Sequence, residues 1–369
     1  MSDYHMLGYI HESPRALQAT LQENQVDIRK IAALVQEKKI NKVVLSGLGS
    51  SYTSALMAMP IYQRFCRYPT VVINSEETGY YADKWIDEYS LVVVVSRSGE
   101  RGAVVDTLNL AKKKGGLGVA VTGVADSLLA QHSTLSLITR EGAEITFPKT
   151  KSVITCTGIL MRLCLELLDQ NDKAAWGYLD RLDSIPDMQQ ATILALEPQI
   201  QELLPFIKDC KLLNVTGTCS NHGAALEAAI KVQEASFVPT RGDSTSGLLQ
   251  GPVGALTPEW LVMPLVMKED LTLSIDLLKL VRQFGARSVA VYPQGLEIKD
   301  QCDHSLVIPK PVDPYLAALV YLPAIQLLAY YWTVERGMNP DAPSSMDSIL
   351  KSILPPGRQE PELKNKKEQ

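Results

Sequence analysis

Short apolar runs separated by longer amphipathic segments dominate the first part of the chain. The runs are rich in valine, isoleucine and leucine and occupy residues 43–45, 70–74, 91–95, 118–121 and 135–138. Continuous rather than alternating hydrophobicity is typical of strands that are buried on both faces of a parallel sheet. The LVVVV run at 91–95 fits the centre of such a sheet.

Helical segments are expected between these strands. Residues 1–40 are predicted to be helical, with Ser13 as an N-cap and Pro14 at the first helical position. Residues 150–168 form a predicted long helix that is apolar on nearly all sides and therefore buried. Strands that alternate with helices predict a doubly wound α/β sheet, in which ligands bind at the carboxyl ends of the strands.

The same order of elements begins again in the second part of the chain. A predicted strand at 212–215 is followed by a Thr/Gly/Ser turn and a helix, then by a helix at 270–285 and strands at 288–292 and 305–308. A shift of 170 residues superposes the two turns, and it pairs Gly47 with Gly217, Ser50 with Ser220, and Ala55-Leu56 with Ala225-Leu226. This agreement indicates an internal duplication.

The polar segment 170–195 is predicted to be rich in turns and to separate the two copies. We therefore expect two tandem domains, each a doubly wound, flavodoxin-like parallel sheet between helices. The expected parts are an N-terminal helical segment at 1–30, a first domain at 31–185, a second domain at 196–345, and a charged C-terminal tail at 346–369.

Composition narrows the class of protein. The 369 residues include 36 lysines and arginines and 41 acidic residues, a net charge of −5 that argues against a general nucleic-acid surface. The six cysteines occur singly and without a zinc-binding spacing, which predicts reduced thiols in a cytoplasmic protein and no metal site. The N-terminus lacks the apolar region of a secretory signal.

One segment is long and apolar enough to be tested as a membrane span. Residues 315–332 reach the necessary length, but Pro323 and Gln326 lie inside the segment. We expect no membrane partner. A helix buried at a domain or dimer interface explains the composition better.

Two Gly/Ser turns are the strongest candidates for a ligand site. Residues 46–51 join a predicted strand to a helix, and residues 96–101 do the same at the end of another strand of that sheet. The first backbone N–H groups of a helix have no partner within the helix, and the hydroxyls of Ser50 and Ser51 lie beside them, so a phosphate fits there. An ordinary N-capped loop is the structural alternative.

Four other residues have a structural and a functional interpretation. Glu227, Lys231 and Glu234 are spaced i, i+4 and i+7, which by itself indicates a solvated helical face with a favourable Glu–Lys pair. His222 lies near a predicted turn, where a single histidine is usually structural. Residues 246–252 are predicted to be a loop.

Taken together, these segments resemble the sugar isomerase (SIS) family over nearly the whole chain, from the N-terminus to the turn at 339–343. Ser96–Glu100 is similar to the phosphate loop of the family, and Glu144-Ile145 with Thr150-Lys151 to its E-I-x-x-x-S-T-K segment. Ala225–Ser236 resembles the A-L-E-G-A-L-K-L-K-E-x-S helix of a second SIS domain, and Gln250–Pro252 falls where H-G-P is expected. The layout is similar to fructosamine-6-phosphate deglycases and to the isomerase half of glucosamine-6-phosphate synthase.

The resemblance implies two tandem SIS domains, no cofactor, and a homodimer that binds a small sugar phosphate. It implies Glu234 as the proton-transferring base and Lys231 as the group that holds this carboxylate ionised. Gln250 stands in the place of the family's acid, and His222 is a candidate replacement for it. The residues that the resemblance assigns to the substrate and its phosphate are Gly49, Ser50, Ser51, Ser96, Arg97, Ser98, Arg101, Thr150 and Lys151.

Several positions depart from the family pattern. Gln250 replaces the histidine of H-G-P, and Gly247 replaces the glutamate shortly before it. Ser348 falls at the Schiff-base lysine, with Lys351 three residues further on, and Arg101 replaces a threonine. Two functions are therefore expected to compete: an enzyme that releases an amine from a phosphorylated amino sugar or a fructosamine 6-phosphate, and a protein that senses a sugar phosphate without catalysis.

Overall fold

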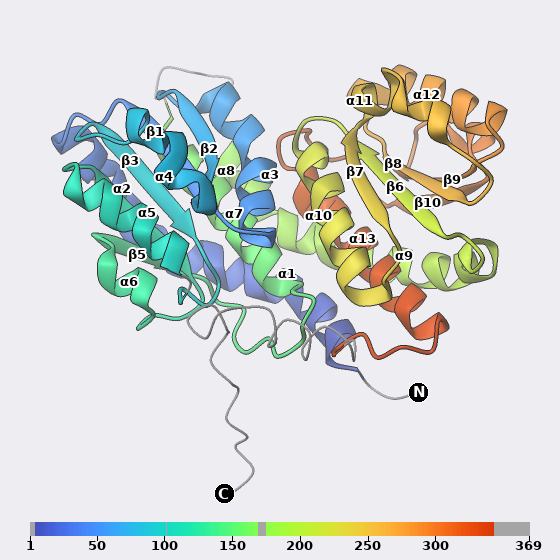
Figure 1. Cartoon of the computed structure of the whole chain (residues 1–369), viewed down its shortest axis with the longest axis horizontal. Helices are drawn as coiled ribbons and strands as arrows, with labels where there is room; N and C mark the ends of the chain where they lie inside the picture. Colours follow the sequence, from blue (N-terminus) through green and yellow to red (C-terminus); the bar gives the residue numbers. More distant parts are fainter. Residues whose placement is uncertain (1–3, 101, 169–174, 343–369) are drawn as a thin grey trace, which may run out of the picture.

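A computed structural model describes residues 4–100, 102–168 and 175–342. Figure 1 shows two α/β halves side by side, with helices between the two sheets. We call residues 42–166 the first half and residues 212–335 the second half. Both halves are doubly wound, as the alternation of apolar runs and amphipathic segments predicts.

The sheet of the first half is entirely parallel and has the order β2-β1-β3-β4-β5. The central strand contains the LVVVV run, and all six residues of the strand, Ser90–Val95, are buried. The five predicted strands are confirmed as β1 (Lys42–Gly47), β2 (Thr70–Asn74), β3 (Ser90–Val95), β4 (Leu117–Thr122) and β5 (Leu135–Ile138).

The sheet of the second half repeats this topology, in the order β7-β6-β8-β9-β10. Its strands are β6 (Leu212–Gly217), β7 (Thr240–Ser244), β8 (Trp260–Leu265), β9 (Arg287–Pro293) and β10 (His304–Ile308). The starts of β1, β2, β3 and β4 each lie 170 residues before those of β6, β7, β8 and β9. The structure therefore supports the internal duplication along the whole sheet.

Strands β7 and β8 were not predicted from the sequence. Strand β7 lies at the sheet edge and reads TRGDS, so its polar residues look like a loop. Strand β8 contains Pro264, which has no N–H to donate to the neighbouring strand. Its pairing with β9 skips this position, because Leu261, Val262 and Leu265 have partners there.

A helical layer between the two sheets forms the largest core. Helices α3 and α10 contact each other, α7 lies against α3, and α13 lies against α10 and α9 (Figure 1). These helices are α1 (His5–Glu23), α3 (Ser50–Phe65), α7 (Lys151–Glu166), α9 (Ile185–Ile207), α10 (Ser220–Ser236) and α13 (Ala317–Glu335). The shared layer brings the helices of one half next to the turns of the other.

Shorter or peripheral elements complete the described chain. The remaining helices are α2 (Gln25–Glu37), α4 (Thr78–Tyr81), α5 (Gly102–Lys113), α6 (Leu128–His132), α8 (Tyr178–Asp183), α11 (Thr245–Leu249) and α12 (Leu271–Gln283). Short 3₁₀ turns are η1 (Ser75–Glu77), η2 (Ala82–Lys84), η4 (Pro252–Ala255), η5 (Lys268–Asp270) and η6 (Lys299–Gln301).

Helix α13 corrects one expectation and supports another. Among the described residues, α13 is the helix that is long and apolar enough to span a membrane. However, 89% of its apolar stretch is buried inside the protein. The predicted burial is confirmed. Of the two interfaces expected to bury this helix, the one inside the chain does so and no dimer interface is needed to cover it, because α9, α10 and α7 of the same chain pack against it.

Two predicted helix boundaries are also wrong. Helix α1 begins at His5 and continues through Pro14, because its buried stripe of apolar residues runs on both sides of the proline. The Ser13 hydroxyl is not an N-cap and donates instead to the Tyr9 carbonyl at 2.9 Å. Helix α8 and the start of α9, at Ile185, lie in the segment 170–195 that was predicted to be rich in turns, so most of its described part is helical. The tail at 346–369 lies outside the described residues.

Candidate functional site

The two Gly/Ser turns of the first half meet at one edge of its sheet. They follow β1 and β3, which are hydrogen-bonded neighbours whose connections leave in opposite directions, so the turns flank a topological switch point. Gly99 has φ +68°, and a Cβ there would lie 2.4 Å from the Ser127 Oγ, so the second turn requires glycine. The sheet therefore brings both predicted phosphate-binding turns together.

The four predicted serine hydroxyls have different surroundings. Ser51 and Ser98 are partly exposed at this edge. Ser96 is buried, and its Oγ accepts a hydrogen bond from the Gly99 N–H at 3.2 Å, which closes the second turn. Ser50 donates to Glu227 Oε1 at 3.0 Å. Ser51 and Ser98 are thus placed for a ligand, whereas Ser50 and Ser96 shape the site.

Arg97 is held on the inner side of the second turn. Its guanidinium lies 3.8 Å from Glu141 and donates to the Gly142 carbonyl at 3.4 Å. Glu141 is buried, and burial raises the pKa of its carboxyl group. Arg97 therefore contacts a carboxylate that the sequence did not bring to attention. Arg101 lies outside the described residues.

A buried chain of charges runs from the first turn into α10. Glu227 accepts hydrogen bonds from Ser50 and, at 2.5 Å, from Thr53 of α3. The Lys231 Nζ lies 3.4 Å from Glu227 and 3.1 Å from Glu234. The side chains of Glu227 and Lys231 are 1% and 0% exposed, whereas Glu234 is 27% exposed. The expected solvated face is therefore wrong, and only its last member reaches solvent.

The electrostatics of this chain follow from its burial. Burial raises the pKa of Glu227, although Lys231 and Thr53 oppose the shift. Burial alone would lower the pKa of Lys231, but the carboxylates of Glu234 and Glu227 outweigh it and raise this pKa. Lys231 therefore stays protonated between two carboxylates, of which Glu234 reaches solvent.

Thr150 and Lys151 serve the fold at the start of α7. Glu144 accepts hydrogen bonds from the Thr150 N–H at 2.6 Å, the Thr150 hydroxyl at 2.8 Å and the Lys151 N–H at 2.9 Å. The Lys151 Nζ donates to Glu12 at 2.6 Å. Both predicted site residues are buried, so neither presents its side chain to a ligand in this structure.

His222 lies away from Glu234, and Gln250 is exposed to solvent. His222 and Glu234 are twelve residues apart on one helix, which separates them by roughly 18 Å at 1.5 Å per residue. His222 therefore cannot act as the acid beside Glu234 of the same chain. Gln250 is exposed at the end of α11, a helix where the sequence predicted a loop. The N-cap of α11 is Ser244, whose hydroxyl accepts a hydrogen bond from the Gly247 N–H at 3.0 Å. This capping serine is the sequence signal for the helix that was missed.

Thr53 and Glu141 complete the site and were not predicted. Thr53 lies one turn after Ser50 on α3. Residues three apart share a face of a helix, so the spacing from Ser50 was the sequence signal for Thr53. Glu141 follows the end of β5 by three residues, and no motif singled it out. Among residues 4–100, 102–168 and 175–342, no group of three or more His, Cys, Asp or Glu side chains is arranged to hold a metal ion.

Comparisons with known proteins agree with this geometry. Residues 37–165 match the SIS domain. A glutamine–fructose-6-phosphate aminotransferase (isomerizing) of Thermococcus kodakarensis is 29% identical over 92% of this chain, which spans 57% of that protein. The chain therefore corresponds to part of the length of this relative.

Solved structures share the fold of both halves. The C-terminal domain of the glucosamine–fructose-6-phosphate aminotransferase of Francisella tularensis superposes with a TM-score of 0.81 at 22% identity, covering 92% of this chain and 98% of that one. A glucosamine-6-phosphate deaminase of Thermotoga maritima gives a TM-score of 0.75 at 23% identity, covering 92% and 97%. The chain has this α/β fold, and its residues 37–165 match the SIS domain.

Proposed function

We propose that the protein is an enzyme of the phosphosugar isomerase type that releases the amine from a phosphorylated amino sugar or a fructosamine 6-phosphate. The observation that carries this proposal is the position of Glu234. It is the one carboxylate of the buried chain on α10 that reaches solvent, and Lys231 holds it at 3.1 Å. Ser50 connects the other end of the chain to the first phosphate-binding turn.

The geometry supports a division of labour between the two halves. The helix N-terminus at Ser50–Ser51 and the hydroxyl of Ser98 would bind the phosphate dianion. Glu234 would remove a proton from one of the carbons C1 and C2 to form an enaminol, and would return it to the other carbon. The product is an imine, and water then adds to its carbon and releases the amine and a hexose phosphate. The ammonium group of Lys231, 3.1 Å from Glu234, would hold this carboxylate in place.

A sensor of sugar phosphates is the second candidate, and Gln250 favours it. Its amide cannot exchange a proton near neutral pH, and it stands where the resembling family has a histidine. The similarity to an aminotransferase and a deaminase that act on amino-sugar chemistry, by their names, favours the enzyme.

The rate of amine release tests the enzyme directly. A panel of hexosamine 6-phosphates and fructosamine 6-phosphates identifies the substrate. With that substrate, Glu234→Gln should lower kcat by about 10²–10⁴ and leave ligand affinity within a few-fold. Glu259→Gln is the matched control, because Glu259 pairs with Lys211 at the surface. Retained kcat in Glu234→Gln would exclude Glu234 as the base, and amine release from no member of the panel would favour the sensor.

A further inference from the structure

Two cysteines lie side by side where helices α3 and α7 end. Cys66 follows α3 directly, and its backbone pairs with Leu168 in an isolated antiparallel bridge. The Arg67 N–H also donates to the Leu167 carbonyl at 3.4 Å. Cys164 lies in the last turn of α7, four residues before Leu168. The ends of the two helices are therefore tied together, and each of them carries one cysteine.

The two sulfur atoms are hydrogen-bonding partners. The Cys164 thiol donates to the Cys66 sulfur, and this hydrogen bond lowers the pKa of Cys66 although burial opposes the shift. Burial, together with the same contact, raises the pKa of Cys164 well above its ordinary value. Cys66 is partly exposed, whereas Cys164 is buried. The pair thus joins a thiol that ionises more readily than usual and reaches solvent to a protonated thiol behind it.

Tyr62 completes this cluster. It lies one turn before Cys66 on α3, its side chain is buried, and its hydroxyl has no hydrogen-bond partner among residues 4–100, 102–168 and 175–342. Burial raises the pKa of this hydroxyl well above its ordinary value, and the sulfurs of Cys164 and Cys66 add to the shift. A buried hydroxyl without a partner is unusual in a folded protein. Here it is a neutral donor near both sulfurs, and it can donate to an oxygen atom carried by Cys66.

We propose that Cys66 and Cys164 form a redox-active pair that a hydroperoxide converts into a disulfide. The Cys66 thiolate attacks the terminal oxygen of the hydroperoxide and the O–O bond breaks, which leaves a sulfenic acid on Cys66. The leaving oxygen takes the proton that Cys66 had released and departs as water, or as an alcohol from an organic hydroperoxide.

The second step uses the neighbouring thiol. The Cys164 sulfur loses its proton and attacks the Cys66 sulfur, so the S–S bond forms and the S–O bond breaks. The released hydroxide takes up that proton and leaves as water. In total the two thiols lose two electrons and two protons, and the hydroperoxide gains them.

The fold is suited to this bond. The sulfurs are already in hydrogen-bonding contact in the reduced protein, so little rearrangement is needed. Residues 66–164 contain β2 to β5, and a cross-link around such a long loop restricts the unfolded chain and stabilises the folded one. Helix α3 begins at the candidate site of the first half, which we call the first site. The disulfide would fix the opposite end of that helix, and this inference does not depend on the proposed reaction.

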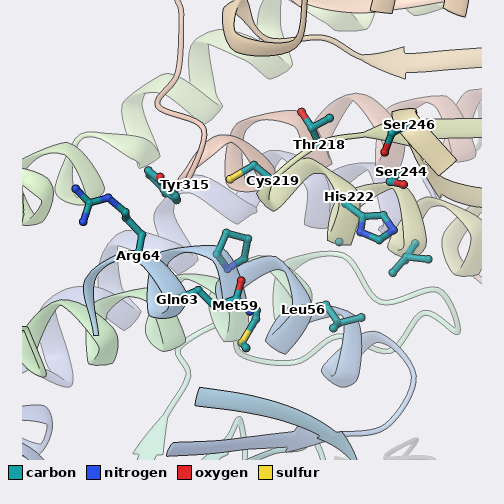
Figure 2. A pocket seen from close by; sticks show the side chains of 13 residues that line it. Leu56, Met59, Gln63, Arg64, Thr218, Cys219, His222, Ser244, Ser246 and Tyr315 are labelled. Atoms are coloured by element: carbon teal, nitrogen blue, oxygen red, sulfur yellow. The ribbon is translucent and has the colours of Figure 1, made fainter. Parts of the chain in front are cut away.

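Cys219 provides a comparison within the same chain. Figure 2 shows it beside a cavity of about 690 Å³ that lies between α3 and the turn after β6. Like Cys66 it is partly exposed, but burial raises its pKa to about 11. Because the thiolate is the reactive form, Cys66 should be oxidised at least about tenfold faster than Cys219.

Peptide mapping by mass spectrometry tests the pair. The reduced full chain is treated with hydrogen peroxide at neutral pH, and the remaining thiols are alkylated before digestion. Cleavage by trypsin at the arginines of positions 64, 67 and 162 puts Cys66, Cys156 and Cys164 on three separate peptides. We expect a cross-linked peptide that joins Cys66 to Cys164 and is lost on treatment with dithiothreitol. The oxidised protein should unfold at a higher urea concentration than the reduced protein.

Two variants separate the roles of the thiols. Cys164→Ala should stop at the sulfenic acid of Cys66, which dimedone traps. Cys156→Ala, which removes another buried thiol of α7, should form the cross-link as the wild type does. The proposal is overturned if hydrogen peroxide produces no cross-link between Cys66 and Cys164, if the cross-link requires Cys156, or if Cys219 is oxidised as fast as Cys66. A cross-linked protein that unfolds at a lower urea concentration than the reduced one would also overturn it.

Discussion

The two halves of the molecule have one topology and different turns. After β3 the first half carries Ser96 and Ser98, and after β8 the equivalent positions of the second half are Val266 and Lys268. In the second half the Asp270 carboxylate accepts hydrogen bonds from the Met267 N–H and from the Thr218 hydroxyl. The comparison shows that a duplicated scaffold keeps its strands and helices while the chemistry is set by a few loop residues.

The helices between the sheets show the same contrast. Helix α10 has Glu227, Lys231 and Glu234, and the equivalent α3 residues are Met57, Ile61 and Arg64. Ser50 and Thr53 of the first half bind the Glu227 carboxylate of the second. The first half therefore supplies the turns of the candidate site, and the second half supplies the carboxylate proposed as its base. Neither half contains the complete site.

The largest expected effect comes from removing the cation that the second half buries. Lys231→Met leaves Glu227 buried beside an apolar group, and breaking a buried pair in this way costs about 3–5 kcal/mol of unfolding free energy. Chemical denaturation should therefore show a clearly lower midpoint.

Lys211→Met is the control, because Lys211 pairs with Glu259 at the surface, and this variant should unfold as the wild type does. A Lys231→Met protein as stable as the wild type would contradict the account of the buried chain.

Glu144 tests a buried carboxylate of the first half. Burial alone would raise its pKa, but hydrogen bonds from Ser152 and Thr150 outweigh burial and lower it. We expect Glu144→Gln to cost about 1.5–3 kcal/mol at neutral pH, the range for hydrogen bonds to a charged group. Because the folded-state pKa is below the unfolded one, this stabilisation is full above the ordinary glutamate pKa and is lost as the pH falls through the folded value.

The stability difference between wild type and Glu144→Gln should consequently shrink on acidification below the ordinary glutamate pKa. Urea denaturation across the acidic range measures it. A difference that grows as the pH falls would show that the carboxylate is not stabilised in its ionised form.

Ligand binding sharpens the comparison between the two turns. Ser98→Ala should weaken binding of a hexose 6-phosphate at the first site by about 1–3 kcal/mol, because it removes a hydroxyl from the phosphate. Lys268→Ala, at the equivalent position of the second half, should leave that affinity unchanged. Calorimetry with the phosphorylated and unphosphorylated sugar measures both, and equal affinity for the two sugars would contradict phosphate recognition.

The smallest expected effect concerns a homodimer, which we propose from the family resemblance. Gln250 is exposed on the second half, and the family resemblance implies that it lies against the first site of a neighbouring subunit. Gln250→His should raise amine release, and light scattering should give about twice the 40.6 kDa chain mass. A fully active monomer would refute a shared site.

The sequence predicts most of the sheets because buried parallel strands have continuous apolar runs. Strand β7 is polar and β8 contains Pro264, and their place in the sheet depends on pairing with β6. Spacing suggested a solvated face for Lys231, because a helical pattern does not show which helix will cover it. The burial of this lysine and the role of Thr53 follow from the contact between α3 and α10, which joins residues more than 170 positions apart.

Proton exchange at the sugar tests the central claim most directly. The bound phosphosugar is incubated in D₂O with wild type or Glu234→Gln, and NMR follows deuterium at C1 and C2. If the second half supplies the base to a ligand held by the turns of the first half, the wild type exchanges one of these protons and Glu234→Gln does not, although it still binds the sugar. Exchange at the same rate in both proteins, or in neither, would contradict the account.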